Sequence, residues 1–228
     1  MTLKIIAFDA DDTLFVNEPY FQETEQKFCD LMSDYLSHQG LSQELFKTEI
    51  ANLDLYGYGI KGYILSMIEA ALKISNNTLS LEVIEKIIEL GKELLQKPIE
   101  LLEGVEYTLK ALHGKYKLIV ATKGDLKDQQ RKLHDSGLGN YFHHIEVMAD
   151  KQEINYEKLL KRLEINADEF FMIGNSLKSD VLPVLNIGGH AVHVPFHTTW
   201  EHEKISHKVE HPNFKTLEKI SDVLEILL

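Results

Sequence analysis

The sequence predicts an α/β protein, a doubly wound, Rossmann-like parallel sheet with an inserted α-helical domain. A short apolar strand comes first, a long block with helical periodicity follows it, and strands and helices then alternate to the end of the chain. Because strand–helix–strand units of this length need right-handed crossovers, the strands are expected in one parallel sheet. We expect residues 1–16 and 98–228 to form the sheet domain and residues 17–97 the helical domain.

The strands are expected where short apolar runs end in polar residues. The first is Lys4–Phe8, which is apolar on both faces, as in a buried parallel sheet. Further strands are expected at 118–121, 145–148, 170–173 and 191–194. Helical patterns fall between these strands and after the last one, at 128–134, 156–163, 178–185 and 214–227.

Between Glu18 and Gln96 the apolar residues have the spacing of helices and not of strands. They form three stripes, which are Phe21, Thr24, Phe28, Leu31 and Tyr35; Ile64, Met67, Ile68 and Ala71; and Ile84, Ile87, Ile88, Gly91 and Leu94. The single cysteine, Cys29, lies in the first stripe and is interpreted as a core residue and not as a nucleophile. A single cysteine cannot form an internal disulfide. A protein without disulfides is typical of a reducing compartment.

The composition is that of a globular protein, with 44% hydrophobic and 26% charged residues in 228. A net charge of -12 argues against a nucleic-acid partner, which requires a basic surface. We recognise no signal peptide and no run of about 18 apolar residues that would span a membrane. A cytoplasmic protein without a membrane partner is therefore expected.

Polar residues gather directly after the first strand, where the ligand crevice of an open parallel sheet lies. The sequence there is Asp9-Ala10-Asp11-Asp12-Thr13. Asp9 and Asp11 can point toward the same region, and two adjacent carboxylates need a cation or a shared proton between them. Mg²⁺, which prefers oxygen ligands, would supply that charge. A solvated acidic turn that caps the next helix is the alternative interpretation.

Three later strands also end in residues suited to binding an anion or a metal. Thr122, followed by Lys123 and Gly124, is typical of a phosphate-binding turn, with a helix N-cap as the alternative. Lys151 can screen nearby carboxylates and bind a phosphate oxygen, although an ordinary surface lysine is the alternative. The polar run Gly174–Asp180 can complete a shell of oxygen ligands.

Together, the four strand ends resemble those of the haloacid dehalogenase superfamily, in particular its phosphatases with an inserted helical cap. The family's D-x-D-x-T motif is matched by Asp9–Thr13, and its second and third motifs by Thr122 and Lys151. Its fourth motif, usually G-D-x-x-x-x-D, is matched by Gly174–Asp180. The resemblance covers the sheet domain, at about residues 2–15 and 103–195.

The resemblance implies a Mg²⁺-dependent phosphatase that acts on a small phosphorylated metabolite. It makes Asp9 the nucleophile that forms an aspartyl-phosphate. Asp11 would protonate the leaving alcohol and then activate the water that hydrolyses this intermediate. Thr122 and Lys151 would hold the transferring phosphoryl group, and Lys123 is a further candidate for substrate binding.

The same resemblance implies where Mg²⁺ would bind. Its ligands would be the carboxylate of Asp9, the backbone carbonyl of Asp11 and the fourth motif. Asn175 stands where the family usually has a metal-binding aspartate. Its amide oxygen can coordinate Mg²⁺ but brings no charge, so Asp180 is the candidate for an anionic ligand, directly or through water.

The helical block lies between the first and second motifs, as do the helical caps that close over the site in this superfamily. Its segment Asp54–Tyr63 holds three tyrosines, three glycines and Lys61 between two helical patterns. This segment is expected to be a loop that faces a polar ligand, with Lys61 binding a second anionic group. A connection between helices with packed tyrosines is the alternative.

Other functions remain open at this point. A haloacid dehalogenase would share the nucleophile but would not need the proton donor Asp11, and a phosphomutase would share all four motifs. Asn175 also allows a catalytically weak, binding-only member. A receiver domain does not fit, because it is about half as long and has no inserted lobe. The late histidines match no zinc pattern. The sequence indicates neither the particular substrate nor an oligomeric state.

Overall fold

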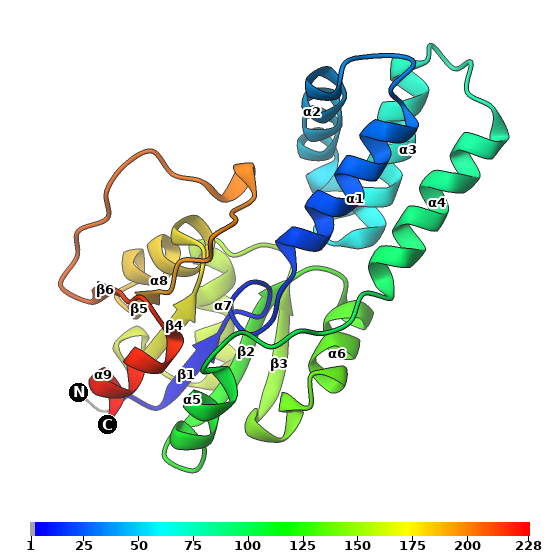
Figure 1. The fold of residues 1–228 in the computed structure, drawn as a ribbon. Coiled ribbons are helices and arrows are strands. Elements are labelled where there is room, and N and C mark those ends of the chain that lie inside the picture. The colour runs from blue at the N-terminus through cyan, green and yellow to red at the C-terminus, as the bar shows by residue number, and fades with distance from the viewer. Residues whose placement is uncertain (1–2) are drawn as a thin grey trace. The chain divides into compact units, whose positions relative to one another are not determined.

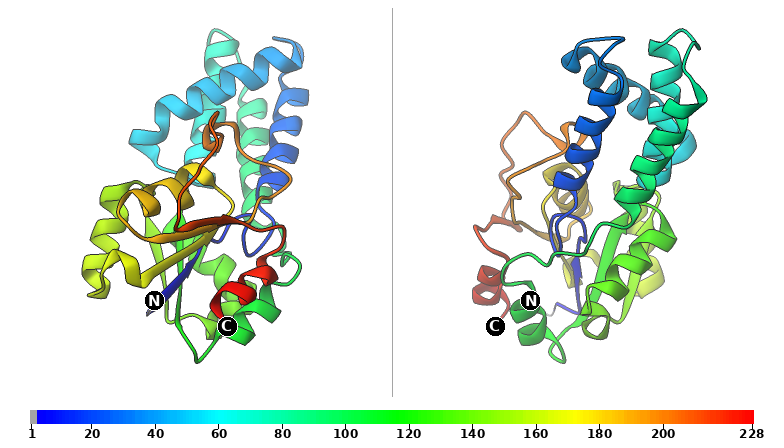
Figure 2. Two further views of the ribbon diagram at one scale, coloured as in Figure 1. Left: turned by 90° about the vertical axis from the view of Figure 1, so that its left-hand side faces the viewer. Right: turned by 45° about the vertical axis from the view of Figure 1, so that its right-hand side comes forward.

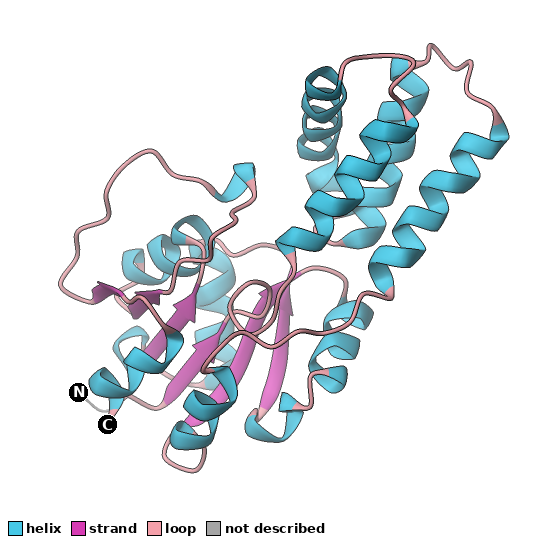
Figure 3. Ribbon diagram, viewed as in Figure 1, coloured by secondary structure: helices cyan, strands magenta, loops and turns pink. Residues whose placement is uncertain are grey.

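The computed structural model describes residues 3–228, which belong to two compact units. The sheet unit comprises the chain up to Glu18 together with Ile99–Leu228, and the helical unit comprises Pro19–Pro98. Figure 3 shows that every strand belongs to the sheet unit. No helix within residues 3–228 is both long and apolar enough to cross a membrane.

Within residues 3–228 the sheet has six strands, all parallel, in the order β3-β2-β1-β4-β5-β6 (Figure 1). Their bounds are Ile5–Phe8 (β1), Lys117–Lys123 (β2), His144–Met148 (β3), Phe170–Gly174 (β4), His190–His193 (β5) and Phe214–Thr216 (β6). The chain passes from β1 outward to β3 and then returns to the other side of β1. The predicted doubly wound α/β fold is therefore confirmed, and the strand order reverses at β1, the position beside which open parallel sheets bind ligands.

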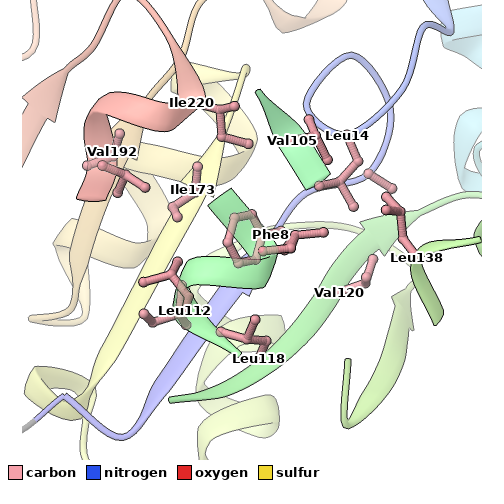
Figure 4. Close-up of a cluster of buried hydrophobic side chains, with 14 of the residues drawn as sticks. Phe8, Leu14, Val105, Leu112, Leu118, Val120, Leu138, Ile173, Val192 and Ile220 are labelled. Atoms are coloured by element: carbon pink, nitrogen blue, oxygen red, sulfur yellow. The ribbon is translucent and has the colours of Figure 1, made fainter. Parts of the chain in front are cut away.

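Helices cover both faces of the sheet because successive residues of β1 point to opposite sides. Ile6 and Phe8 point into one core with α5 (Val105–Leu112), α6 (Leu126–Asp135) and α9 (Leu224–Leu227), shown in Figure 4. Ile5 and Ala7 point into a second core with α7 (Glu153–Leu163) and α8 (Leu182–Asn186). Burial on both faces explains why β1 has no polar residue.

The helical unit contains α1 (Glu18–Leu31, which begins at the last residue of the sheet unit), α2 (His38–Tyr56), α3 (Ile60–Ile74) and α4 (Leu81–Leu95). Its core includes Phe28, Met67 and Cys29, which is fully buried, as the stripes predicted. Gly91 lets α4 approach α3, because a Cβ at this position would lie 2.0 Å from Cδ1 of Ile64. Tyr35 of the first stripe lies beyond the end of α1 and is 40% exposed, so the expectation that it packs in that stripe was wrong.

Two further local predictions were wrong. The helix expected at 214–227 is instead β6, a 3-10 helix at Ile220–Val223 and the short α9. Phe214 pairs with Ala191 of β5, and this sheet contact outweighs the helical spacing of the apolar residues. The loop expected at Asp54–Tyr63 is mostly helical, because α2 runs to Tyr56 and α3 starts at Ile60. Helix α5 was not predicted.

The chain segments that leave and re-enter the sheet unit run beside each other. The amide of Val16 donates to the carbonyl of Glu100 at 2.9 Å, and the amide of Leu102 donates to the carbonyl of Leu14 at 3.0 Å. Phe15 and Leu101 form an antiparallel bridge between these two hydrogen bonds. The helical unit is thus inserted through a two-stranded connection.

Candidate active site

In the turn after β1 the Asp9 carboxylate is buried, and Asp12 caps the helix that follows. The amide of Asp9 continues the sheet by donating to the carbonyl of Ile173 at 2.9 Å. Asp12 has a φ of 60° and accepts from the amides of Asn17 at 2.8 Å and Glu18 at 3.0 Å, where α1 begins. Because Asp12 caps the helix, the side chains of Asp9 and Asp11 are available for other roles.

Lys151 joins two buried aspartates from different strand ends. Its Nζ lies 2.5 Å from Oδ1 of Asp9 and 2.6 Å from Oδ1 of Asp180, and all three side chains are almost completely buried. Burial alone would lower the pKa of Lys151, but Asp180 and Asp9 raise it above its ordinary value, so the amine stays cationic. Burial raises the pKa of Asp9 to about 7, against the opposing effect of Lys151.

Asp180 is fixed on both of its oxygens. Oδ1 accepts from Lys151, and Oδ2 accepts from the amide of Ser176 at 3.0 Å. The aspartate lies in a π-helical turn, Leu177–Val181, and packs against Gly174. A Cβ at Gly174 would lie 2.2 Å from Oδ2 of Asp180, so glycine is required here by space. Single π-helical turns are rare and occur often at functional sites.

Asn175 and Asp9 direct oxygen atoms toward one hydroxyl. Thr13 Oγ1 lies 3.1 Å from Oδ2 of Asp9 and 3.4 Å from Oδ1 of Asn175. The carbonyl of Asn175 is held by Nε2 of His193 at 3.0 Å. Within residues 3–228 no three His, Cys, Asp or Glu side chains form a metal-binding cluster. The two oxygens that the Thr13 hydroxyl meets are a carboxylate oxygen and an amide oxygen, which are ligands of the kind that Mg²⁺ accepts.

Asp11 is held by two side chains of α6. Lys132 Nζ lies 2.5 Å from its Oδ1, and Gln129 Nε2 donates to its Oδ2 at 2.7 Å. The Asp11 side chain is 24% exposed, against 8% for Asp9. Asp11 is thus the more accessible of the two carboxylates.

The sequence reasoning missed Gln129 and Lys132. Both are buried polar residues of α6, together with Asp128. These positions (i, i+1 and i+4) lie on one face of a helix whose buried residues are all polar. This polar face is the sequence feature from which Gln129 and Lys132 could have been identified.

The structure does not bring all of the other predicted substrate-binding residues to Asp9. Thr122 is buried at the end of β2, and its hydroxyl donates to the carbonyl of Lys123 at 3.2 Å. The ammonium of Lys123 contacts Oγ of Ser179 at 2.9 Å and Oε1 of Glu203 at 2.6 Å. Lys61 belongs to the helical unit, where it lies exposed in the first turn of α3.

Comparisons with known proteins agree with the fold. The family model of the haloacid dehalogenase-like hydrolases matches residues 3–188. No curated protein matches the sequence. A haloacid dehalogenase-like family hydrolase from Xanthomonas campestris is 34% identical, with a TM-score of 0.89 over 99% of this chain and 91% of that one.

Two more distant structures share the fold only. The magnesium-bound structure of YfnB from Bacillus subtilis is 17% identical, with a TM-score of 0.67 over 100% of this chain and 99% of that one. A 2-haloacid dehalogenase from Pseudomonas syringae pv. Tomato is 19% identical, with a TM-score of 0.64 over 99% and 98% of the two chains. Structures named as a 2-haloacid dehalogenase and as a phosphatase share the fold, so the reaction has to be argued from the site.

Proposed function

The chain belongs to the haloacid dehalogenase-like hydrolases, and from that premise we propose that it hydrolyses the phosphate monoester of a small metabolite with Asp9 as nucleophile. The contact of Lys151 with both Asp9 and Asp180 carries the proposal. The ammonium of Lys151 thus lies directly beside the Asp9 oxygen in an otherwise acidic protein. An incoming phosphoryl group needs such charge.

In the proposed first step an oxygen of Asp9 attacks phosphorus, the ester bond breaks, and an aspartyl-phosphate forms. The hydroxyl of Thr13 donates to Oδ2 of Asp9 and would hold the carboxylate in one orientation. Lys151 would stabilise the negative charge of the phosphoryl oxygens. Thr122 is proposed as a further donor to these oxygens.

Asp11 is proposed as the general acid and base. It would give a proton to the departing alcohol and then take one from the water that attacks the aspartyl-phosphate, which releases inorganic phosphate and restores Asp9. Its greater exposure supports this role. Lys132 and Gln129 hold both carboxylate oxygens and would fix the orientation of Asp11.

The residues fit a magnesium ion. Asp9 and Asn175 would hold it, since each directs an oxygen toward the Thr13 hydroxyl, and the carbonyl of Asp11 is the third proposed ligand. Mg²⁺ would supply further charge stabilisation of the phosphoryl oxygens. We propose that Asp180 acts mainly through Lys151, because its oxygens accept from Lys151 and from the amide of Ser176.

The presence of Asp11 also favours phosphate hydrolysis over dehalogenation by a protein of the same fold. A halide leaves as an anion and needs no proton. A dehalogenase therefore does not need a general acid at this position. Phosphate transfer to a second hydroxyl, as in a mutase, would use the same residues. Hydrolysis and phosphate transfer are therefore distinguished by their products, because only hydrolysis releases inorganic phosphate.

The proposal is tested with p-nitrophenyl phosphate and a panel of phosphorylated metabolites. We expect turnover that requires Mg²⁺, is abolished by EDTA, and releases one inorganic phosphate per alcohol. Asp9→Asn should lower kcat by at least about 10³-fold, while Asp34→Asn, an exposed aspartate of the helical unit, should leave it unchanged. Turnover that survives both EDTA and Asp9→Asn would refute the proposal.

Lys61 remains the proposed contact for a second anionic group of the substrate. If it has this role, Lys61→Ala should raise KM for substrates that carry a second anionic group and leave KM for p-nitrophenyl phosphate unchanged. Unchanged KM values across the whole panel would remove Lys61 from the site.

A further inference from the structure

The chain between β5 and β6 makes a long excursion outside the matched family region. The family model ends at residue 188, and residues 194–213 connect the two strands. Figure 2 shows this connection, in orange, as an extended loop with one short turn. That turn is the 3-10 helix Glu201–Glu203. We call residues 194–213 the strap.

Glu203 attaches the strap to two of the motif-bearing strand ends. Its Oε1 accepts from Nζ of Lys123 at 2.6 Å. Its Oε2 accepts from the hydroxyls of Ser176 at 2.5 Å and Ser179 at 2.6 Å. The side chains of Glu203 and Lys123 are each only 13% exposed. A second attachment comes from Lys178, whose Nζ donates to the carbonyl of His202 at 2.7 Å.

The carboxylate of Glu203 is held in its charged form. Burial works against the charge, but Lys123 and the two serine hydroxyls lower the pKa of Glu203 to about 2. Glu203 is therefore an anion throughout the neutral pH range and accepts from three donors at once. A neutral amide of the same shape could not accept at both ends.

The two serines are part of the turn that holds Asp180. The amide of Ser176 donates to Oδ2 of Asp180, and the amide of Ser179 donates to Oγ of Ser176 at 3.0 Å. Asp180 in turn fixes Lys151, and Lys151 contacts Asp9. A continuous series of polar contacts thus connects the strap to the proposed nucleophile.

We propose that Glu203 is a positioning residue, which fixes the π-helical turn Leu177–Val181 so that Asp180 holds Lys151 against Asp9. Lys123 is then the counter-charge of Glu203 and not a ligand of the substrate phosphate. This inference rests on the proposed function for its effect on catalysis. Its structural part concerns the order of the turn and does not depend on the reaction.

The decisive experiment compares Glu203→Gln with Glu201→Gln. Both remove one negative charge from the same 3-10 helix, but the Glu201 side chain is 66% exposed and pairs only with Lys204 among the described ion pairs. For Glu203→Gln we expect kcat to fall about 10- to 100-fold, because small displacements of catalytic groups are costly. We expect KM to stay within about twofold, since no substrate contact is lost. Glu201→Gln should match the wild type.

Amide hydrogen exchange separates positioning from general loss of stability. Exchange at 176–181 should accelerate in Glu203→Gln, while exchange in β1 and α5 stays as in the wild type. An unchanged exchange rate at 176–181, or a fall in kcat fully accounted for by unfolded protein, would overturn the proposal. If the wild type has no phosphatase activity, the proposed function fails, and the exchange comparison still decides whether the strap orders the turn.

The double variant Lys123→Met/Glu203→Gln covers the case in which the single variant does not fold. It removes both members of the buried pair, so no uncompensated charge is left behind. We expect this variant to fold and still to show fast exchange at 176–181 and a reduced kcat. Wild-type values of both quantities in the double variant would contradict the role of Glu203.

Discussion

Nζ of Lys132 lies 2.5 Å from Oδ1 of Asp11. The lysine comes from α6, 121 residues along the chain from the aspartate, and its own side chain is buried. Since the proposed acid and base is bound to a cation, its orientation depends on a helix that carries none of the four motifs. The proposed site therefore includes residues outside the motifs.

Lys132→Met tests this dependence. Methionine keeps most of the side-chain volume but donates no hydrogen bond, so Asp11 should lose its orientation. We expect kcat to fall about 10- to 100-fold, less than the full contribution of a general acid, while KM changes little. Steady-state kinetics measure both constants. Lys127→Met, an exposed position of the same helix, is the control and should not differ from the wild type. Equal kcat values in the two variants would show that Lys132 does not orient Asp11.

Gly174→Ala tests the close packing under Asp180. The added methyl group would lie 2.2 Å from Oδ2 of Asp180, so the aspartate or the turn must move. We expect a loss of about 1–3 kcal/mol in the free energy of unfolding, measured with urea, and a marked loss of kcat. Gly139→Ala is the control, because its Cβ would meet nothing within 4 Å. A Gly174→Ala protein with full stability and activity would contradict the packing described here.

Stability should depend on pH through Glu203. Its pKa is lowered to about 2 in the folded protein, so the stabilisation it gives is complete above the unfolded pKa and is lost as pH falls. Between pH 7 and pH 4 the stability advantage of the wild type over Glu203→Gln should shrink by about 1 kcal/mol. Urea unfolding of both proteins at the two pH values measures this difference. A pH-independent advantage would mean that Glu203 has an ordinary pKa.

Gly91→Ala tests the crossing of α3 and α4 in the helical unit. Its Cβ would lie 2.0 Å from Cδ1 of Ile64, so either the Ile64 side chain or one of the two helices must move. We expect a loss of about 1–3 kcal/mol, despite the better helix propensity of alanine. In Gly91→Ala/Ile64→Ala the obstacle is gone, so the two substitutions should be strongly non-additive in a double-mutant cycle. Additive losses would show that the contact does not limit the approach of the helices.

The fold could be predicted because its signals are local and repeated. The apolar run of β1 and the alternation after residue 98 are sufficient to specify a doubly wound sheet. The prediction failed where a tertiary contact decided the conformation. Phe214 has helical spacing with its neighbours, yet its pairing with Ala191 makes it part of β6.

The candidate site could be predicted in part for the same reason. Asp9, Lys151 and Asp180 follow strands and were identified from these positions, and the structure brings them into contact. Lys132 and Glu203 could not be found in this way. Each acts on a strand end from a distant segment, so only the folded chain reveals its partner.

The paired connection at Val16 and Glu100 has a consequence for how this protein can diversify. Chain ends that are hydrogen-bonded to each other can accept inserts of very different size, because the entropic cost of closing a loop rises only slowly with its length. The inserted unit can therefore be replaced by another one while the strand register and the positions of Asp9 and Asp11 stay unchanged. Under the proposed function, such an exchange would alter substrate contacts of the inserted unit, such as Lys61, and leave the residues of the phosphate chemistry unchanged.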